Sequence, residues 1–347
     1  PDHSHFPPAR AAMLMKKHVF CEKPLGHSVA ECRILTDLAR KQKIQTQLGN
    51  QRHATSNMHR TVEIVQSGLL GEITEVHAGI WGGARGMPSY PTFQIPAPDT
   101  LHWDLWLGAA KKRPFAIMDP KTDRAKGQMG DYAPYFWHFW WDFGTGETGN
   151  WGCHVLDIPF WALDLKYPTH VKCIGGESAD KDRTPKDMII EFQFPKRNNL
   201  PACRLIWDTT RNPESKKYWK SKTEPFPQGY CAAFVGTKGV LFSGLDRYSK
   251  RWLFMNDDHN DLPMPEESIP KSPGFWKEWT DACTEKGPAP TCQFDYSGPL
   301  SETSLLANVA FRAGRNGFQW DADSLVCLDC PEAQALIKPE LYNGFTY

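Results

Sequence analysis

Apolar positions in the first 71 residues alternate between helical spacing and short strand-like runs. The predicted order is helix, strand, helix, strand and helix, at residues 6–15, 17–21, 28–39, 44–48 and 62–68. The second helix opens on Ser28 and Glu31, which have the spacing of a capping box. This rhythm is typical of a parallel sheet with crossover helices. Because such a domain does not normally begin on a loop after a strand, we expect residues 1–71 to be the second half of a doubly wound, Rossmann-type domain.

From residue 72 the pattern changes to short strands separated by turn residues. The expected strands are residues 73–81, 171–174, 188–194, 203–209, 230–235 and 240–242. They predict an α/β domain at 72–300 with a large, mostly antiparallel open sheet. Residues 82–143 form a long insert rich in proline and aromatic residues, and loops of this length are usually functional when they are ordered. A helix at 305–313 falls in a C-terminal region, 301–347, that is expected to pack back on both domains.

Composition narrows the possible partners. Among the 347 residues, 40 Lys and Arg balance 40 Asp and Glu, so no electrostatic attraction to nucleic acid or to an anionic membrane is expected. No run of about 18 apolar residues could span a bilayer. The ten cysteines include one CxxC, Cys327 to Cys330, without a second pair or nearby histidines, so we expect no metal site. Free thiols favour the cytoplasm, and the periplasm remains the alternative if an export signal precedes Pro1.

Three short patterns carry the candidate chemistry. They are Pro1-Asp2-His3-Ser4-His5, then Glu22-Lys23-Pro24, then Asn150-Trp151-Gly152-Cys153-His154 with Asp157 after it. In this order they resemble the Gfo/Idh/MocA oxidoreductases, and the run Trp141-Asp142-Phe143-Gly144-Thr145-Gly146 resembles the branch common in planctomycete-type bacteria. The resemblance implies NAD or NADP as cofactor, a homodimer or homotetramer, and oxidation of a secondary hydroxyl on a sugar, cyclitol or polyol.

The resemblance assigns catalytic roles to Lys23 and His154. Lys23 follows a strand, at the sheet edge where ligands bind in open α/β folds, and its ammonium group can polarise a substrate hydroxyl. A neutral His154 can take the hydroxyl proton as general base. The family places an acid four residues before this histidine; here it is Asn150, which we expect to orient His154 without adding charge. Asp157, one helical turn further on, would hold the ring or bind a substrate hydroxyl, or simply be solvated.

The same resemblance assigns the cofactor and substrate contacts. Residues expected along the ribose and nicotinamide are Pro1, Asp2, His3, Glu22, Lys23 and Asn50. Gln51 is expected at the cleft rim near the substrate. Trp137, Trp140 and Trp141 would either form a wall of the substrate site, with Trp141 in contact with the substrate, or pack in the core.

Residues Gly144 to Gly149 satisfy the string GxGxxG, but we reject them as a dinucleotide fingerprint. The motif needs a hydrophobic strand before it and a βαβ unit around it, and neither is predicted here. We expect this stretch to lead into the helix of His154. The family's phosphate-binding loop would precede Pro1, with about three further βα units of ~30 residues each.

Two alternatives to the dehydrogenase remain open. The chain could oxidise a sugar transiently with bound NAD so that a glycosidic bond is eliminated. If the sequence is a naturally shortened form rather than a fragment of a longer chain, it could be a sugar-binding or oligomerising remnant without cofactor.

Overall fold

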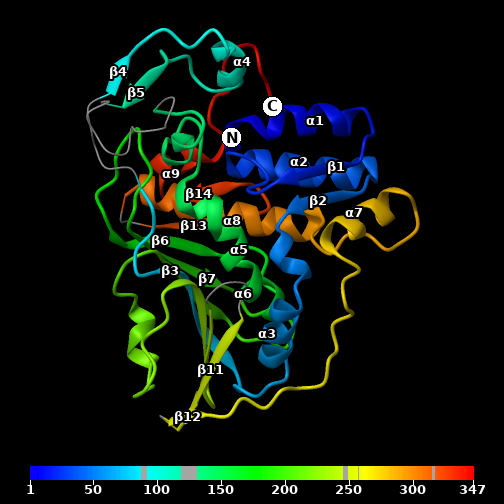
Figure 1. The fold of residues 1–347 in the computed structure, drawn as a ribbon, viewed down its shortest axis with the longest axis vertical. Coiled ribbons are helices and arrows are strands. Elements are labelled where there is room, and N and C mark those ends of the chain that lie inside the picture. The colour runs from blue at the N-terminus through cyan, green and yellow to red at the C-terminus, as the bar shows by residue number, and fades with distance from the viewer. Residues whose placement is uncertain (87–91, 119–130, 245–248, 257, 315–316) are drawn as a thin grey trace.

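The first 71 residues form a small parallel sheet between helices. The computed structural model describes residues 1–86, 92–118, 131–244, 249–256, 258–314 and 317–347. Its first elements are α1 (Phe6–Leu14), β1 (Val19–Glu22), α2 (Val29–Gln42), β2 (Thr46–Gly49) and α3 (Ser56–Gln66). β1 and β2 pair in parallel, α1 packs against α2, and α7 (Phe275–Cys283) packs its aromatic residues against Phe20 of β1. The expected strand–helix rhythm is confirmed (Figure 1).

A ten-stranded sheet forms the second body of the molecule. Its order is β12 (Asp258–Asn260), β11 (Lys250–Met255), β10 (Val240–Gly244), β9 (Gly229–Gly236), β3 (Ile73–Trp81), β8 (Cys203–Asp208), β7 (Met188–Phe194), β6 (His170–Gly176), β13 (Phe318–Asp321) and β14 (Val326–Leu328). Within this sheet, as far as its strands are described, only the pairing of β3 with β8 is parallel. The predicted large, mostly antiparallel sheet is therefore confirmed.

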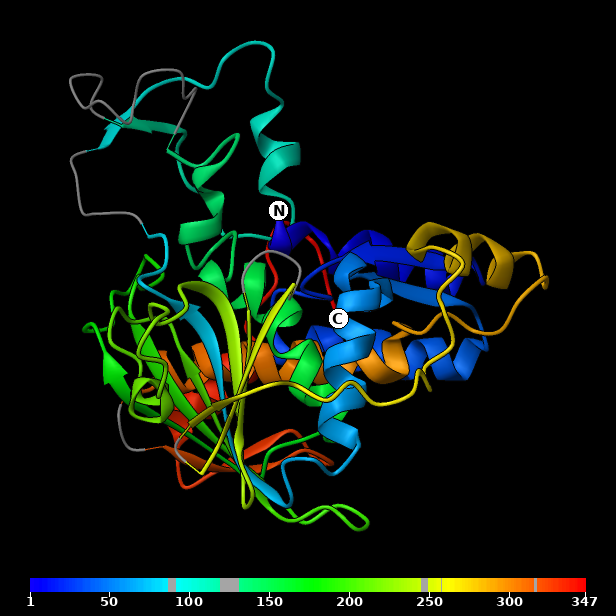
Figure 2. The ribbon, with the colours of Figure 1, turned by 60° about the horizontal axis from the view of Figure 1, so that its bottom comes forward.

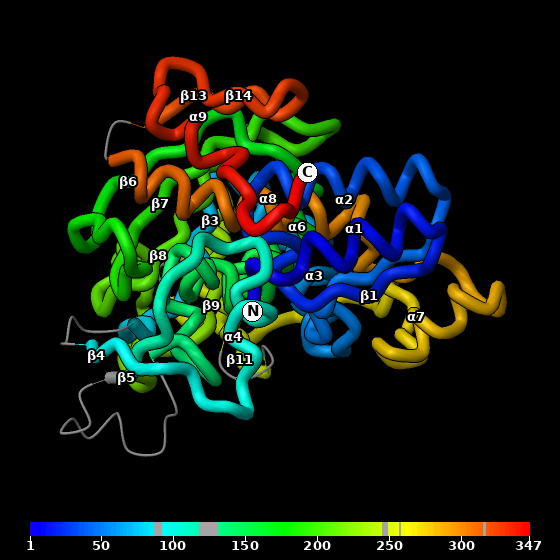
Figure 3. The backbone as a smooth tube through the Cα atoms, turned by 90° about the horizontal axis from the view of Figure 1, so that it is seen from above, coloured from blue at the N-terminus to red at the C-terminus, as the bar shows by residue number. Residues whose placement is uncertain are grey.

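Helix α8 (Phe294–Arg312) joins the two sheets. It packs on α2 and β2 on one side and on β6 and β7 on the other, and it is buried along nearly its whole length (Figures 1 and 3). It begins eleven residues before the predicted start at Leu305, so the boundary expected at residue 300 falls inside it. A helix buried on all sides shows no amphipathic period, and its internal Pro299 hides the start further. After α8, β13 and β14 extend the large sheet, and α9 (Pro331–Ile337) packs on α8.

The insert folds as a separate lobe with its own aromatic core. Its described elements are β4 (Thr92–Gln94), α4 (Trp103–Leu107), β5 (Ala116–Met118) and a short 3-10 helix at Phe136–Phe139. The core of the lobe contains Tyr132, Trp140 and Phe143, packed among further tryptophans. Figure 2 shows the lobe standing apart from the ten-stranded sheet. Parts of the predicted insert, residues 87–91 and 119–130, lie outside the described residues.

The segment with the GxGxxG string has no strand before it. Residues 139–143 belong to a 3-10 helix and a turn, and a π-helical turn at Thr148–Gly152 leads into α5 (Cys153–Val155) and α6 (Asp157–Ala162). The expectation that this stretch leads into the helix of His154 is confirmed. None of the described helices is both long and apolar enough to cross a lipid bilayer.

Candidate active site

The site forms where the loop after β1 meets the π-helical turn. A Cβ atom on Gly149 would lie only 1.7 Å from Oγ1 of Thr145 and 3.2 Å from Cγ of Pro24. Glycine at this position therefore allows the turn to approach the loop that carries Lys23. The close approach brings together residues that are more than 100 positions apart in the sequence.

Lys23 is the first group that this approach brings into contact. Its Nζ atom donates to Oδ1 of Asn150 at 2.7 Å, and Nδ2 of Asn150 donates to the carboxylate of Glu147 at 3.3 Å. Glu147 in turn accepts from Nε of Arg85 at 2.5 Å. Asn150, which we expected beside His154, thus connects Lys23 to a buried carboxylate. We call this chain, Lys23 to Asn150 to Glu147 to Arg85, the lysine relay.

His154 is held by a second asparagine. Nδ2 of Asn50 donates to Oδ2 of Asp157 at 2.8 Å and to the carbonyl oxygen of Cys153 at 3.0 Å. Both amide hydrogens are then used, so the Oδ1 atom of Asn50 must face the ring, and it contacts Nδ1 of His154. An acceptor at this place makes Nδ1 the protonated nitrogen and leaves Nε2 with the lone pair. The ring therefore has the tautomer that a general base acting through Nε2 needs.

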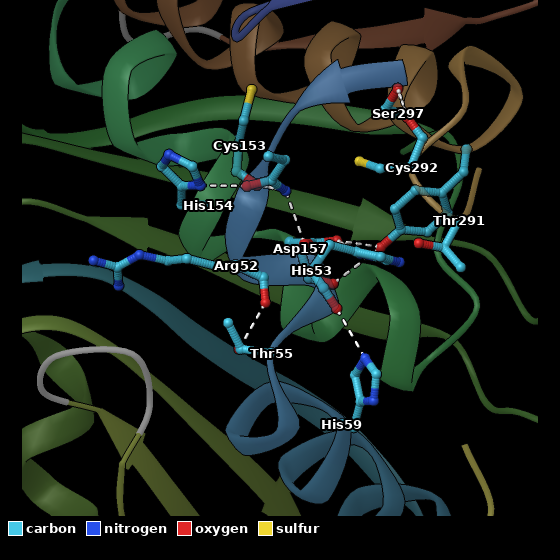
Figure 4. A network of polar contacts seen from close by, with 12 residues as sticks. Arg52, His53, Thr55, His59, Cys153, His154, Asp157, Thr291, Cys292 and Ser297 are labelled. Carbon is cyan, nitrogen blue, oxygen red and sulfur yellow. Dashed lines mark hydrogen bonds and ion pairs between the residues drawn. The ribbon is translucent and has the colours of Figure 1, made fainter. Parts of the chain in front are cut away.

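Asp157 lies at the centre of this second network, which we call the histidine relay. Its side chain is fully buried and accepts from Asn50, from Nδ1 of His53 at 3.0 Å, and from the hydroxyl of Tyr296 at 2.5 Å. His53 also stacks on Trp161, with ring centroids 4.2 Å apart. Figure 4 shows His154 and Asp157 facing the segment that carries Arg52 and His53. With its oxygens occupied, Asp157 is placed to hold Asn50 and, through it, the His154 ring, rather than a substrate hydroxyl.

Electrostatics show that Lys23 and His154 share one environment. Burial is the main cause that lowers the pKa of His154 to about 3, and the positive charges of Lys23 and Arg52 lower it further. His154 is therefore neutral at physiological pH. The two groups that we expected to converge on one carbinol lie close enough to interact.

An aromatic stack that the sequence did not reveal lies beside His154. Trp151 and Tyr230 stack with centroids 3.6 Å apart, and the Arg52 guanidinium lies 4.9 Å from the Trp151 ring centroid. The Trp151 ring is also 5.4 Å from that of His154. Trp151 lies inside the motif, but nothing in the sequence indicates its pairing with Tyr230, 79 residues later.

Asp2 and His3 have structural partners in the described chain. Oδ2 of Asp2 accepts from the backbone nitrogen of Thr145 at 3.0 Å, and both ring nitrogens of His3 contact backbone oxygens, of Phe143 and Trp106. Both side chains are 3 % exposed. These contacts fasten the start of the chain to the insert and to Thr145.

Glu22, Asn50 and Gln51 lie at the carboxyl ends of β1 and β2, as expected. Nε2 of Gln51 donates to Oε1 of Glu22 at 3.2 Å, and partial burial raises the pKa of Glu22. Together with Lys23 these groups form a polar rim of donors and acceptors at the carboxyl ends of β1 and β2. No glycine-rich loop that follows a strand and opens a helix occurs in the described ranges, so a diphosphate cradle is not part of this rim.

The three tryptophans of the insert make packing contacts. Trp140 and Trp141 are 4 % and 6 % exposed, and Trp137 stacks on His138 with centroids 3.6 Å apart. The Arg312 guanidinium lies 4.9 Å from the centroid of Trp141. Trp140 is therefore a core residue, whereas Trp141, although nearly buried, also lines a cavity of about 200 Å³, and its contact with substrate stays a prediction.

Thiol and metal chemistry are not indicated here. All ten cysteines are free, and burial raises the pKa of Cys153, next to His154, to about 11, so this thiol is not an activated nucleophile. The described residues contain no cluster of three or more His, Cys, Asp or Glu that could hold a metal ion.

The geometry defines a class of fold: a two-sheet α/β protein with a lysine–histidine site at the end of a parallel sheet. Residues 1–50 match the model of an oxidoreductase family with an NAD-binding Rossmann fold. An inositol 2-dehydrogenase of Salmonella typhimurium is 33% identical over 107 residues, which is 29% of this chain and 32% of that protein. An uncharacterized oxidoreductase of Streptococcus pneumoniae is 27% identical over 89 residues, 26% of this chain and 24% of that protein. The aligned part thus spans a quarter to a third of these curated relatives.

Solved structures share the fold over most of the chain. An inositol dehydrogenase homolog of Azotobacter vinelandii in complex with NAD+ has a TM-score of 0.57 at 14% identity, and the match covers 92% of this chain and 76% of that one. An NAD-binding protein of Listeria innocua gives 0.56 at 16% identity, with the same coverage. The match over residues 1–50 is to the Gfo/Idh/MocA family that the motifs of the chain resemble, and the solved structures share its fold.

Proposed function

We propose that this chain oxidises a secondary hydroxyl of a sugar, cyclitol or polyol reversibly, with NAD or NADP as hydride acceptor. The observation that carries the proposal is that Lys23 lies close enough to the neutral, Nδ1-protonated His154 to influence its charge. The polar rim of Glu22, Asn50 and Gln51 lies beside them. The cofactors of related structures and the inositol dehydrogenases among the relatives agree with this chemistry.

The roles of the chain's own residues follow from the geometry. The Lys23 ammonium group donates to the substrate oxygen and stabilises the negative charge that develops on it. Nε2 of His154 takes the hydroxyl proton, while the Asn50 oxygen at Nδ1 keeps the ring in place. Nicotinamide, when bound, accepts the hydride from the carbinol carbon. The products are a ketone, the reduced cofactor and one proton.

The cofactor would lie along the rim at the carboxyl ends of β1 and β2, where Pro1, Glu22 and Lys23 provide contacts for its nicotinamide–ribose end. Parallel α/β sheets bind ligands at this edge. The proposal includes no contact for the diphosphate.

The test is nicotinamide absorbance with a panel of inositols, aldoses and polyols, measured on the full-length protein. A single preferred polyol should be oxidised with stoichiometric cofactor reduction, and Lys23→Ala or His154→Ala should abolish the reaction. Full activity of both variants on the preferred substrate would refute the assignment.

A further inference from the structure

A cavity lies between the insert and the segment that joins β6 to β7. Its volume is about 800 Å³. One wall is aromatic and the other is polar, with Tyr135, Phe136 and Phe139 facing Glu177, Asp180 and Lys186. Among its lining residues, Arg85 belongs to the lysine relay, and no lining residue is assigned a chemical step in the proposed reaction.

Backbone hydrogen bonds tie the two walls together. The Thr184 nitrogen donates to the Phe139 oxygen at 2.9 Å, and the Trp141 nitrogen donates to the Asp182 oxygen at 2.9 Å. The Arg183 guanidinium lies 4.7 Å from the centroid of the Trp140 ring. The cavity is therefore framed by main-chain contacts and does not depend on the positions of a few surface side chains.

Arg85 connects the cavity to the active site. It lines the cavity, donates to the Tyr135 hydroxyl and pairs with Glu147, the carboxylate of the lysine relay. His138, one residue before the aromatic wall ends, interacts electrostatically with both Lys23 and Arg85, and burial is the main cause that lowers its pKa to about 4. The cavity thus begins within two side-chain contacts of Asn150, the partner of Lys23.

The chemistry of the walls suits a carbohydrate ring. Aromatic faces pack against the C–H faces of sugars, while carboxylates accept from hydroxyl groups and an ammonium group donates to them. The volume is within the usual ~300–1,000 Å³ of small-molecule sites. The lining carries charges of both signs, so it does not select for an anion.

We infer that this cavity binds the second ring of a glycoside whose first ring is oxidised at Lys23 and His154. The inference rests on the proposed function and narrows its substrate class from free polyols to sugars of at least two rings. No bond of the second ring is made or broken, so the cavity contributes affinity and orientation only.

The test compares cellobiose, maltose and lactose with the corresponding methyl monosaccharides on the full-length protein. For the preferred disaccharide, kcat/KM should exceed that of its methyl monosaccharide by about tenfold or more. Phe136→Ala should remove about tenfold from the disaccharide value and less than twofold from the other. Phe93→Ala, an exposed phenylalanine of the same insert outside the cavity lining, is the matched control and should change neither value.

Binding is measured separately by calorimetric titration of each disaccharide without nicotinamide, on wild type, Phe136→Ala and Lys186→Met. Lys186→Met lies on the opposite wall and still reports if Phe136→Ala does not fold. The inference would be overturned if Phe136→Ala lowered kcat/KM equally for the disaccharide and the methyl monosaccharide. It would also be overturned if both variants bound the disaccharide as tightly as wild type. If no sugar reduces the cofactor but both variants still lose disaccharide binding, the proposed oxidation fails and the cavity assignment stands.

Discussion

The lysine relay and the histidine relay have the same design in different surroundings. In each, an asparagine turns its amide oxygen to the acid–base group and its amide nitrogen to a carboxylate: Asn150 joins Lys23 to Glu147, and Asn50 joins His154 to Asp157. Asp157 is fully buried among Asn50, His53 and Tyr296, whereas Glu147 pairs with Arg85, whose side chain is 48% exposed.

The comparison shows how a neutral amide can orient a reactive group without placing a charge against it. A carboxylate in direct contact with His154 would raise the pKa of the imidazole, whereas the amide of Asn50 leaves that pKa low. The histidine relay should therefore be rigid and sensitive to any change in its buried carboxylate. The lysine relay, which reaches solvent through Arg85, should tolerate changes at its far end.

Removing either reactive group should have the largest effect. Lys23→Met and His154→Gln should each lower kcat/KM for the preferred polyol by about 10²–10⁴-fold, because each removes a proton-transfer or charge-stabilising partner. The double variant should lose about as much as the worse single one. Lys17→Met, at an exposed lysine of the same segment, should keep wild-type kinetics.

Asp157→Asn tests whether the stability of the protein depends on the buried carboxylate of the histidine relay. The new amide would present an NH₂ group to the hydroxyl of Tyr296 or to the His53 ring, leaving buried polar atoms without proper partners. The free energy of unfolding should fall by about 2–3 kcal/mol in a urea titration. A loss below ~0.5 kcal/mol would contradict the central position that the structure gives to Asp157.

Asn150→Asp tests whether a charge at the lysine relay reaches the base. A carboxylate one helical turn from His154 should raise the pKa of the ring from its present value of about 3 by ~1 unit. Because only the neutral ring accepts a proton, the fall in kcat/KM on the acid side should move to higher pH by the same amount. Asn199→Asp, the same charge change at an exposed position, should leave the pH profile unchanged.

Glu147→Gln should have the smallest effect. It removes the ion pair with the half-exposed Arg85 and keeps an oxygen near Asn150, so stability should change by less than ~1 kcal/mol. We expect kcat/KM to fall about threefold, measured beside Glu72→Gln as an exposed control. If Glu147→Gln lowered the free energy of unfolding by more than Asp157→Asn does, the lysine relay rather than the histidine relay would be the more sensitive of the two.

Local signals in the sequence were sufficient for the elements with a strong pattern of their own. Ser28 and Glu31 form the capping box that their spacing predicted, with both reciprocal hydrogen bonds, and residues 73–81 and 188–194 are strands with the predicted bounds. The short strands β13 and β14 were not predicted. With four and three residues, they are defined by pairing with each other and with β6 rather than by composition.

The site shows the same limit at longer range. Lys23 and His154 could be predicted because they occur in short motifs. Asn50 was expected at the cleft rim, but its role at His154 depends on a contact across 104 positions, and Arg85 and Glu147 meet across 62. Such contacts arise from how β1, β2 and the π-helical turn pack, which spacing along one sequence does not encode.

The position of α8 has a consequence for thermal denaturation. One face of this helix packs against β2 and α2, and the opposite face covers β6 and β7. Because both sheets pack on the same helix, unfolding of either sheet exposes a face of α8 and destabilises the other sheet. Heating should therefore give one calorimetric transition for both sheets, and a protein cut between residues 71 and 72 should yield pieces that remain associated.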